Sequence, residues 1–351
     1  MAVPDLLRAL LTAAGPSGYE GAPAAAWREA AAAFAEVTAD TLGSSMARVP
    51  GGAGAPPVIV TGHIDEIGLM VSHVDDDGFL RFLGVGGWDA QILVGQRVLV
   101  CTREGQVPGV IGKKPIHLLD DDQRKKVAEL KDLHIDIGAK GAEEARAMVR
   151  VGDVAVLAAD PLELPNERLV SRSLDNRIGA YVALEVARLV AEAGGAPVDL
   201  VAVANVQEET TFAGARTTAF ALDPRAAIVV EVTHATDAPG IDPKELGHHP
   251  LGSGPVLERG SMLSPQLFEL LHETAEAESI PFSVEAAAMR TGTDADAIHL
   301  SRAGIPTAVV SVPTRYMHSP VEMVSLDDVA ATARLIAATV RRLGPDLSFQ
   351  R

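Results

Sequence analysis

The sequence predicts an α/β fold in which a β-rich segment interrupts an alternation of strands and helices. Strand-like and helix-like segments alternate at both ends of the 351-residue chain, an order typical of layered α/β domains. Between about residues 67 and 165, short apolar runs separated by glycines favour a small barrel or sandwich. Hydrophobic residues make up 47% of the chain, which is enough for a sizeable core. We therefore expect one domain formed by residues 1–67 and 165–351, with residues 68–164 inserted as a second domain.

Charge and cysteine content exclude several classes of protein. The chain has 47 acidic and 30 basic residues and a net charge of −17, which argues against nucleic acid or an anionic membrane as the main partner. Cys101 is the only cysteine, so an internal disulfide framework and a cysteine-rich zinc site are excluded. The N-terminal segment meets Pro16 too early for a secretory signal, and no apolar window reaches the roughly 18–20 residues of a membrane span. We expect a soluble, cytoplasmic protein.

In the first half of the chain, apolar runs and turn residues define the expected elements. A helix is expected at about 22–36, and the apolar run 58–62 suits a buried strand. The charged segment 118–131 is expected to be a solvated loop. The six short strands expected in the insertion are 68–74, 79–83, 96–101, 107–111, 133–137 and 153–157.

Beyond Pro165 the alternation of strands and helices resumes. Residues 175–193 carry apolar side chains at helical spacing and predict a long helix. The other expected elements are strands at 198–206, 226–232 and 307–312 and helices at 214–222, 265–278 and 326–343. The simplest account is a βαβ sheet that the insertion interrupts.

Histidine and acidic residues follow several of these strands, at the sheet edge where open α/β folds build their sites. His63 and Asp65 are two residues apart in extended chain, so Asp65 can bond the ring nitrogen that His63 does not offer to a metal. Taken alone, this pair is more often structural. Asp175 opens the long helix and, taken alone, is more often a helix cap than a ligand.

Three further positions strengthen a metal site. Glu208 and Glu209 leave a buried strand with diverging side chains, so one can bind metal while the other faces substrate or water. Glu231 lies in an apolar run and needs a cation or a proton, because an unpaired buried carboxylate is costly. His318 adds a second imidazole. Together with His63 and Asp175, these residues form the inventory of a two-metal hydrolytic centre with a bridging carboxylate and a general base.

Other candidates carry less weight. His117, His234 and Asp237 could contact substrate, whereas Ser171 and Ser173 lack the context of a nucleophilic serine. A glycoside hydrolase using Glu208 and Glu209 is disfavoured because adjacent residues cannot flank a glycosidic bond from opposite sides. A deacylase with the same metal core and a non-catalytic assembly protein remain alternatives.

The chain resembles the tetrahedral aminopeptidases, the glutamyl aminopeptidase-like dinuclear metallopeptidases. Several long motifs occur in order through nearly the whole chain, so chance agreement is excluded in practice. They are GHIDEIGLMV (62–71), GGWDAQILVGQRV (86–98), GVIGKKPIHL (109–118), DLHIDIGA (132–139), SLDNRIGAY (173–181), VQEETTFAGA (206–215), VTHATDAPG (232–240) and GIPTAVVSVPTRYMHSPVE (304–322).

The resemblance implies a role for each candidate residue. His63 and Glu231 would bind one metal, Glu209 and His318 the other, and Asp175 would bridge both. Glu208 would be the general base, and Asp65 would orient His63. The family often has Asp where this chain has Glu231, so the longer carboxylate is a departure. Stretches that lie near the site in the family, and are candidates for substrate contacts, are Gly292-Thr293-Asp294 and Arg315-Tyr316.

The resemblance also implies the architecture and the partners. It predicts a mixed-sheet, zinc-aminopeptidase-like catalytic domain, with the insertion forming a PDZ-like β-barrel for dimerisation. Dimers would assemble into a hollow dodecamer that admits short peptides. The implied cofactors are two divalent metal ions per subunit, with zinc expected and cobalt acceptable to the same ligands. The implied activity is removal of N-terminal amino acids from short peptides.

Overall fold

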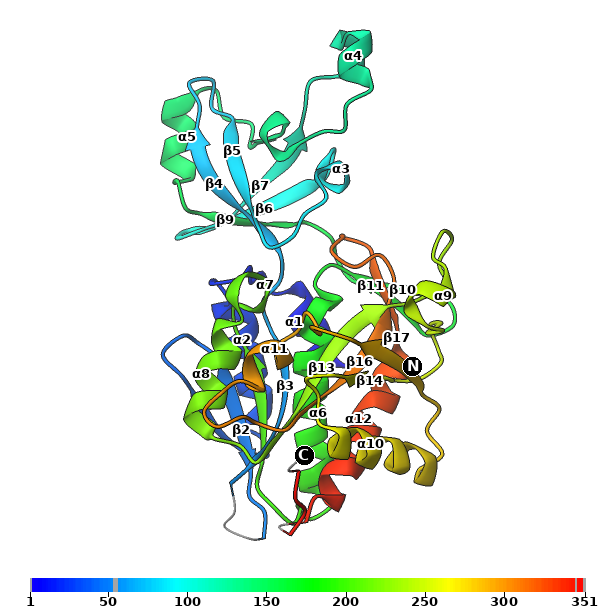
Figure 1. Cartoon of the computed structure of the whole chain (residues 1–351). Coiled ribbons are helices and arrows are strands. Elements are labelled where there is room, and N and C mark those ends of the chain that lie inside the picture. Colours follow the sequence, from blue (N-terminus) through cyan, green and yellow to red (C-terminus); the bar gives the residue numbers. More distant parts are fainter. Residues whose placement is uncertain (1, 53–55, 345, 350–351) are drawn as a thin grey trace.

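An eight-stranded mixed sheet and a closed six-stranded barrel form the framework of the computed structural model (Figure 1). The structure describes residues 2–52, 56–344 and 346–349. The barrel strands lie in residues 68–157, and Figure 1 places the barrel beyond one end of the α/β body. The predicted fold class, a mixed α/β body with an inserted β-barrel, is confirmed.

The four central strands of the large sheet run parallel. They are β12 (Leu200–Asn205), β3 (Val58–His63), β13 (Ala226–His234) and β16 (Thr307–Thr314). All four are fully or almost fully buried, which explains why they read as apolar runs in the sequence. All four predicted strands of the α/β part are therefore confirmed.

Shorter strands complete the sheet on both sides. Strand β2 pairs antiparallel with β12, and β14 pairs antiparallel with β16. Strand β1 extends one edge beyond β2, and β15 forms the other edge beside β14. Their bounds are Glu36–Ala39 (β1), Ser45–Val49 (β2), Val256–Gly260 (β14) and Ser283–Ala287 (β15). These antiparallel additions make the sheet mixed rather than a simple βαβ sheet.

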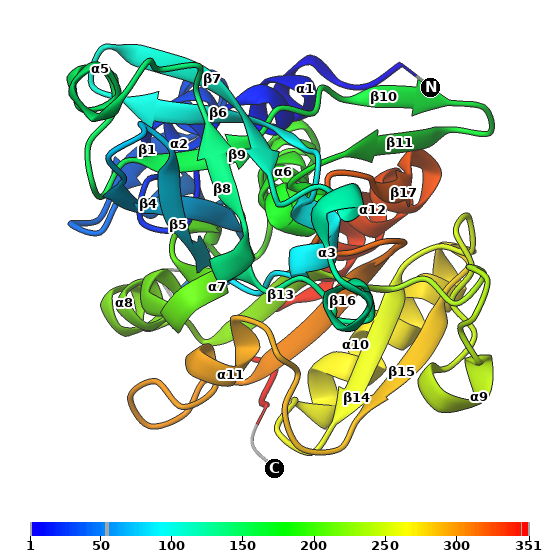
Figure 2. The same cartoon turned by 90° about the horizontal axis from the view of Figure 1, so that it is seen from above.

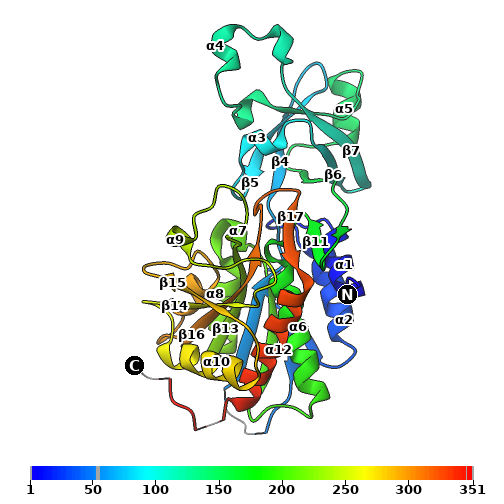
Figure 3. The same ribbon diagram turned by 90° about the vertical axis from the view of Figure 1, so that its right-hand side faces the viewer.

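Helices cover both faces of the sheet. Alternate residues of β3 serve opposite faces: Val58 and Val60 join the core under one helix layer, and Ile59 joins the core under the other. Figure 3 shows α6 and α12 on one side of the strands and α8 on the other. The first layer comprises α1 (Asp5–Thr12), α2 (Gly21–Ala31), α6 (Leu174–Glu192), α10 (Pro265–Ala277) and α12 (Leu326–Arg342), and the second comprises α8 (Ala213–Leu222) and α11 (Ala295–Ile298).

Glycines allow α6 to approach the sheet closely. A Cβ on Gly62 would lie 2.2 Å from the carbonyl carbon of Gly179, and a Cβ on Gly179 would lie 2.4 Å from the carbonyl oxygen of Val230. Side chains at either position would therefore push the helix away from β3 and β13. The close contact brings the first turn of α6, which carries Asp175, to the carboxyl ends of these two strands.

The barrel closes in the order β4-β5-β8-β7-β6-β9, with antiparallel pairing throughout. It has its own apolar core, to which Leu69, Val100 and Ile135 belong. In Figures 1 and 2, α7 (Glu208–Thr211) lies beneath the barrel. The six predicted strands are confirmed as β4 (Gly68–Val74), β5 (Leu80–Val85), β6 (Arg97–Thr102), β7 (Gly105–Gly112), β8 (His134–Asp136) and β9 (Val154–Leu157).

Short helices decorate the barrel, and they correct the predicted loop at 118–131. Asp120 and Gln123 form a capping box that starts α4 (Asp121–Arg124), so local side-chain hydrogen bonds fold part of this charged segment. The other short helices are α3 (Ala90–Leu93), η1 (Ile116–Leu118), η2 (Leu130–Asp132) and α5 (Ala142–Met148).

A three-stranded sheet lies beside the α/β body. Its strands are β10 (Leu162–Leu164), β11 (Arg168–Ser171) and β17 (Glu322–Ser325), in this order. The remaining helix is α9 (Pro243–Leu246). None of the described helices is both long and apolar enough to cross a membrane.

A buried ion cluster fixes the chain where it leaves β3. Glu66 is 3% exposed and accepts hydrogen bonds from the backbone N–H of Gly15 (3.0 Å) and from the guanidinium of Arg177 (2.8 Å). Arg172 forms a second ion pair with the same carboxylate. Arg177 also donates to the backbone carbonyl of Ile64 (3.2 Å). The cluster therefore ties the segment after His63 to the start of α6.

Candidate metal centre

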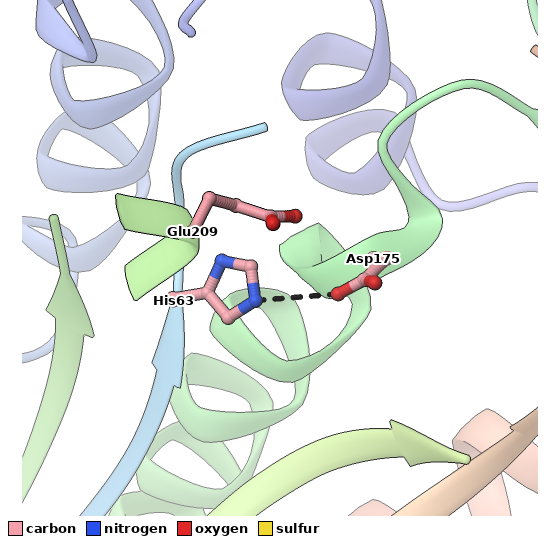
Figure 4. Close-up of side chains that lie close together, drawn as sticks. All are labelled: His63, Asp175 and Glu209. Atoms are coloured by element: carbon pink, nitrogen blue, oxygen red, sulfur yellow. Dashed lines mark ion pairs between the residues drawn. The ribbon is translucent and has the colours of Figure 1, made fainter. Parts of the chain in front are cut away.

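His63, the last residue of β3, points its Nε2 atom at Asp175. The distance from His63 Nε2 to Asp175 Oδ1 is 3.2 Å, and Figure 4 shows Glu209 beside the same two side chains. Ligand atoms of these three residues lie within 4.8 Å of one another. The prediction that Asp175, taken alone, caps the helix is wrong, because Asp175 has non-helical backbone angles and the side chain of Asn176 accepts the N–H of Gly179 (2.9 Å) in its place.

Asp175 lies between the two predicted histidine ligands. Its Oδ1 atom faces His63, and its Oδ2 atom lies 3.3 Å from Nε2 of His318. His318 Nε2 also lies 3.5 Å from Oε2 of Glu209. The opposite ring nitrogen of His318, Nδ1, donates a hydrogen bond to the backbone carbonyl of Gly87 (2.8 Å), which leaves Nε2 free to bind a metal.

Glu208 and Glu231 complete the group on the side of His63. Glu208 Oε2 is 3.6 Å from His63 Nε2, and Glu231 Oε1 is 3.8 Å from the same atom. Glu231 reaches the group from β13, whereas Glu208 begins the short helix α7 directly after β12. We call the six residues His63, Asp175, Glu208, Glu209, Glu231 and His318 the metal centre.

Asp65 connects two parts of the metal centre. Its Oδ1 atom lies 3.3 Å from Nδ1 of His63, on the ring side that faces away from Asp175. The same carboxylate accepts hydrogen bonds from the backbone N–H groups of Glu208 and Glu209, both at 3.1 Å. Asp65 is fully buried, so its carboxylate fixes the first turn of α7 and lies against the ring of His63.

The charges of the metal centre fit divalent cations. Burial raises the pKa of Glu208 to about 9, and neighbouring carboxylates add to the rise. Hydrogen bonds to Asp175 and Glu209 raise the pKa of His318 to about 11. Two buried oxygens, Oε1 of Glu209 and Oε2 of Glu231, have no hydrogen-bond partner among the described residues. Crowded carboxylates with unpartnered oxygens beside imidazole nitrogens are a donor set that transition-metal ions accept.

Sequence reasoning missed several residues that support the metal centre. Glu322 is 2% exposed and accepts hydrogen bonds from the backbone N–H groups of Asp175 (3.0 Å) and His318 (2.9 Å). Asn176 donates to the carbonyl of Val230 (2.8 Å), the residue before Glu231. Glu322 lies inside a recognised motif, but no feature of the sequence indicates which backbone groups it meets.

A cavity of about 510 Å³ opens onto the metal centre. Its lining includes His234, Gly292 and Thr293, three of the predicted candidates for substrate contacts. Asp294 is instead buried, and its Oδ2 atom accepts a hydrogen bond from Asn205 (2.8 Å). Of the other candidates, His117 is exposed on the barrel, while Arg315, which pairs with Asp237, and Tyr316 do not line the cavity. A larger cavity of about 700 Å³ beside Arg225 and Phe349 has no carboxylate in its described lining.

The family model for the M42 glutamyl aminopeptidases matches residues 43–335 of the chain. The chain belongs to the M42 peptidase family. It is therefore an aminopeptidase, a hydrolase that acts on peptide bonds, and membership implies that the activity depends on metal.

Individual M42 relatives agree with this assignment along almost the whole chain. The lysyl aminopeptidase of Pyrococcus furiosus is 38% identical over 316 residues, which cover 88% of each chain. The TET aminopeptidase structure from a marine sediment thaumarchaeon has a TM-score of 0.93 and 38% identity, and the match covers 97% of this chain and 96% of that one. A structure of the Pyrococcus horikoshii TET1 peptidase, described as assembling into a tetrahedron or a large octahedral shell, has a TM-score of 0.84 at 30% identity, with 97% and 99% covered.

Proposed function

We propose that this M42 aminopeptidase removes N-terminal residues from short peptides through a two-metal centre. His63 and Glu231 would hold one ion, Glu209 and His318 the other, and Asp175 would bridge both. The observation that carries this assignment is the position of Asp175, whose two carboxylate oxygens face Nε2 of His63 at 3.2 Å and Nε2 of His318 at 3.3 Å.

Glu208 is the proposed general base. When bound, the ions lower the pKa of a shared water and polarise the scissile carbonyl. Glu208 is 8% exposed and lines the cavity beside His63. The positive charge of bound ions would lower its raised pKa, so that its carboxylate could take a proton from the attacking water and return it to the leaving amine. Asp65 fixes the backbone of Glu208 and faces the ring of His63, which supports its proposed role in orienting both.

The carboxylates of the metal centre also offer a site for the free amino group of a peptide. An ammonium group gains from several carboxylates in a partly closed cavity, whereas an acetylated amine has no charge to contribute. A requirement for this group makes the proposed activity exopeptidic. A deacylase with the same core would not need it, so acetylated substrates separate the two functions.

The same proposal includes the identity of the metal, the division into domains, the assembly and the cellular location. Zinc is the expected metal and cobalt an alternative, because histidine and carboxylate ligands accept both. Residues 1–67 with 165–351 would form the catalytic domain, and 68–164 the dimerisation domain. Dimers would build a dodecamer, as the tetrahedral assembly described for the Pyrococcus horikoshii relative suggests. The cytoplasm is the proposed location, and a chain with one cysteine needs no oxidising compartment.

Hydrolysis of aminoacyl chromogenic amides tests the proposal. Each amide is offered with a free and an acetylated amine to protein stripped by chelator and reloaded with zinc or cobalt. We expect metal-dependent cleavage of the free-amine substrates alone. Cleavage of the acetylated forms would favour the deacylase, and no cleavage with any metal would favour the non-catalytic protein.

Two variants test the roles of individual residues. Glu208→Gln should abolish turnover while both metals remain bound, because the amide cannot accept the proton of the water. His318→Ala should empty one metal position, which elemental analysis of the purified protein measures. Undiminished turnover with two bound metals in both variants would overturn the assignment.

A further inference from the structure

Beyond the metal centre, polar side chains continue in a row across one face of the sheet. Glu231 on β13 is in register with Ser311 on β16, and Ser311 Oγ donates a hydrogen bond to Oε1 of Glu258 on β14 (3.0 Å). Glu258 is in register with Glu285 on the edge strand β15. Ser311 is in register with Val256, two residues before Glu258, so two strand spacings and two residues along β14, roughly 12 Å in all, separate the backbone at Glu231 from that at Glu258. The row reaches from the metal centre to the sheet edge.

Glu258 is a buried carboxylate without a cation. It is 6% exposed, lines the cavity that opens onto the metal centre, and accepts a hydrogen bond only from Ser311 among the described residues. Burial, followed by the negative charge of Glu285, raises its pKa to about 7, and Asp296 adds to the rise. Glu258 forms no ion pair with any residue that the structure describes, so it would gain from a cation that enters the cavity.

Glu285 brings a second carboxylate to the same wall. It is partly buried, lines the cavity, and accepts a hydrogen bond from the hydroxyl of Thr233 (2.8 Å). Thr233 lies two residues beyond Glu231 on β13, which again places the wall beside the metal centre. Arg290, also in the lining, is exposed and forms no ion pair with a described residue. We call Glu258 and Glu285 the acidic wall.

The proposed metals leave the charge of the acidic wall unbalanced. Two divalent ions balance the charges of four carboxylates, and the metal centre contains Asp175, Glu208, Glu209 and Glu231. The proposed metals then leave the acidic wall without a counter-charge in a cavity whose described lining includes one guanidinium, that of the exposed Arg290. A neutral or acidic substrate side chain would leave this charge uncompensated.

We propose that the acidic wall binds the side chain of the substrate's first residue and selects a basic one, lysine or arginine. The proposal rests on the proposed aminopeptidase function, because the metal centre fixes where the first residue lies. Lysine carries its ammonium on a flexible four-carbon stem, which can span the distance from the metal centre to Glu258 and Glu285. The specificity of this chain would then come from β14 and β15, the strands at the edge of the sheet.

A pair of isosteric ligands tests the wall without relying on turnover. Lysine and norleucine differ only in the terminal ammonium, and glutamate carries the opposite charge. Calorimetry with the metal-loaded Glu208→Gln variant should show lysine binding about 10- to 100-fold more tightly than norleucine, the effect of one charged hydrogen bond. The ratio should rise from pH 5.5 to pH 8.5 as Glu258, beside Glu285, Asp296 and Ser311, loses its proton. Equal binding of lysine and norleucine would overturn the proposal.

Variants that remove one charge test whether the acidic wall is what selects the basic side chain. In Glu258→Gln and Glu285→Gln, the ratio of kcat/KM for lysyl over leucyl amides should fall about 10- to 100-fold. Glu285 is partly exposed, so its variant remains informative if Glu258→Gln does not fold. Glu276→Gln removes the same charge from the outer face of α10, where the side chain is 64% exposed, and should leave the ratio unchanged. A ratio that is unchanged in both wall variants would overturn the proposal.

The substrate panel distinguishes a failure of the acidic wall to select a basic residue from a failure of the proposed aminopeptidase function. Metal-dependent cleavage with a preference for leucyl or glutamyl amides would overturn the acidic wall while the aminopeptidase function stands. Preference for glutamyl amides would assign selection to Arg290 instead. No cleavage of any free-amine substrate would refute the proposed function, and the selection with it.

Discussion

Replacing Glu322 by alanine is expected to weaken metal binding although no proposed ligand is removed. Glu322 lies on β17 with 2% exposure, and its two carboxylate oxygens accept the backbone N–H groups of Asp175 (3.0 Å) and His318 (2.9 Å). One carboxylate therefore fixes the backbone of the proposed bridging residue, Asp175, and of a proposed histidine ligand, His318. Without the Glu322 carboxylate, the backbone N–H groups of both proposed ligands lose the acceptor that holds them in place.

The size of the effect follows from these two hydrogen bonds. Hydrogen bonds to charged groups contribute about 1.5–3 kcal/mol each to stability. Their loss should therefore lower the free energy of unfolding by at least about that much and loosen the backbone at Asp175 and His318. Loss of a partner that orients ligands typically costs about 10- to 100-fold in metal affinity, and we expect this for Glu322→Ala. Glu322→Gln keeps one acceptor oxygen but turns an NH₂ group toward the second N–H, so its effect should be smaller.

A matched control separates metal binding from stability. Asp328 is 1% exposed and also accepts two backbone hydrogen bonds, from Gly252 and Gly254, both at 2.7 Å. Asp328→Ala removes an equivalent pair of bonds away from the metal centre. Both alanine variants should lower the Tm of the metal-free protein, but only Glu322→Ala should raise the metal Kd measured by chelator competition. An unchanged Kd in folded Glu322→Ala would refute the reasoning.

Three further predictions concern the framework around the metal centre. Glu66→Ala leaves two guanidinium groups buried without a counter-charge and should cost about 3–5 kcal/mol in urea unfolding. Glu163→Ala breaks the ion pair with Arg8, in which the Arg8 and Glu163 side chains are 44% and 48% exposed, and should lower the free energy of unfolding by less than about 1 kcal/mol. Burial raises the pKa of Glu66, but its arginine partners outweigh burial and lower the pKa below the usual 4.5. The stability that the ionised Glu66 contributes is therefore full above pH 4.5 and is lost as the pH falls further. A steeper loss of stability at acid pH in Glu66→Gln than in the wild type would contradict this. Gly62→Ala drives a Cβ into the backbone of Gly179 and should cost at least about 1–3 kcal/mol, whereas Gly21→Ala, with open space around it, should be tolerated in the same assay.

The central strands could be predicted because parallel strands buried on both faces are nearly continuous apolar runs. Strand β13 is an example, since eight of its nine residues are buried. The edge strands could not be predicted in this way. Strand β1 is mostly exposed and β15 only alternates between partly buried and exposed residues, so neither has an apolar run. Their pairing depends on neighbours that are distant in the sequence.

The same distinction applies to the metal centre. His63 ends the buried strand β3, Glu208 and Glu209 come shortly after the buried strand β12, and recognisable motifs surround them, so the sequence indicates them. Glu322 meets Asp175 across 147 positions, and its role depends on where β17 places it. Glu258 lies on β14, a strand next to the sheet edge that was not predicted, so its approach to the cavity had no signal in the sequence.

The inserted segment also contacts the metal centre, through a hydrogen bond to His318. The carbonyl of Gly87, between β5 and α3, can only accept, so Nδ1 of His318 carries a proton and Nε2 is the nitrogen that could bind a metal after losing its own proton. A Cβ on Gly87 would lie 3.4 Å from the same Nδ1 atom, so a larger residue would crowd the ring. Because the inserted segment orients the ring of a proposed ligand, a displacement of the barrel relative to the sheet would move the Nε2 atom that His318 would offer to a metal.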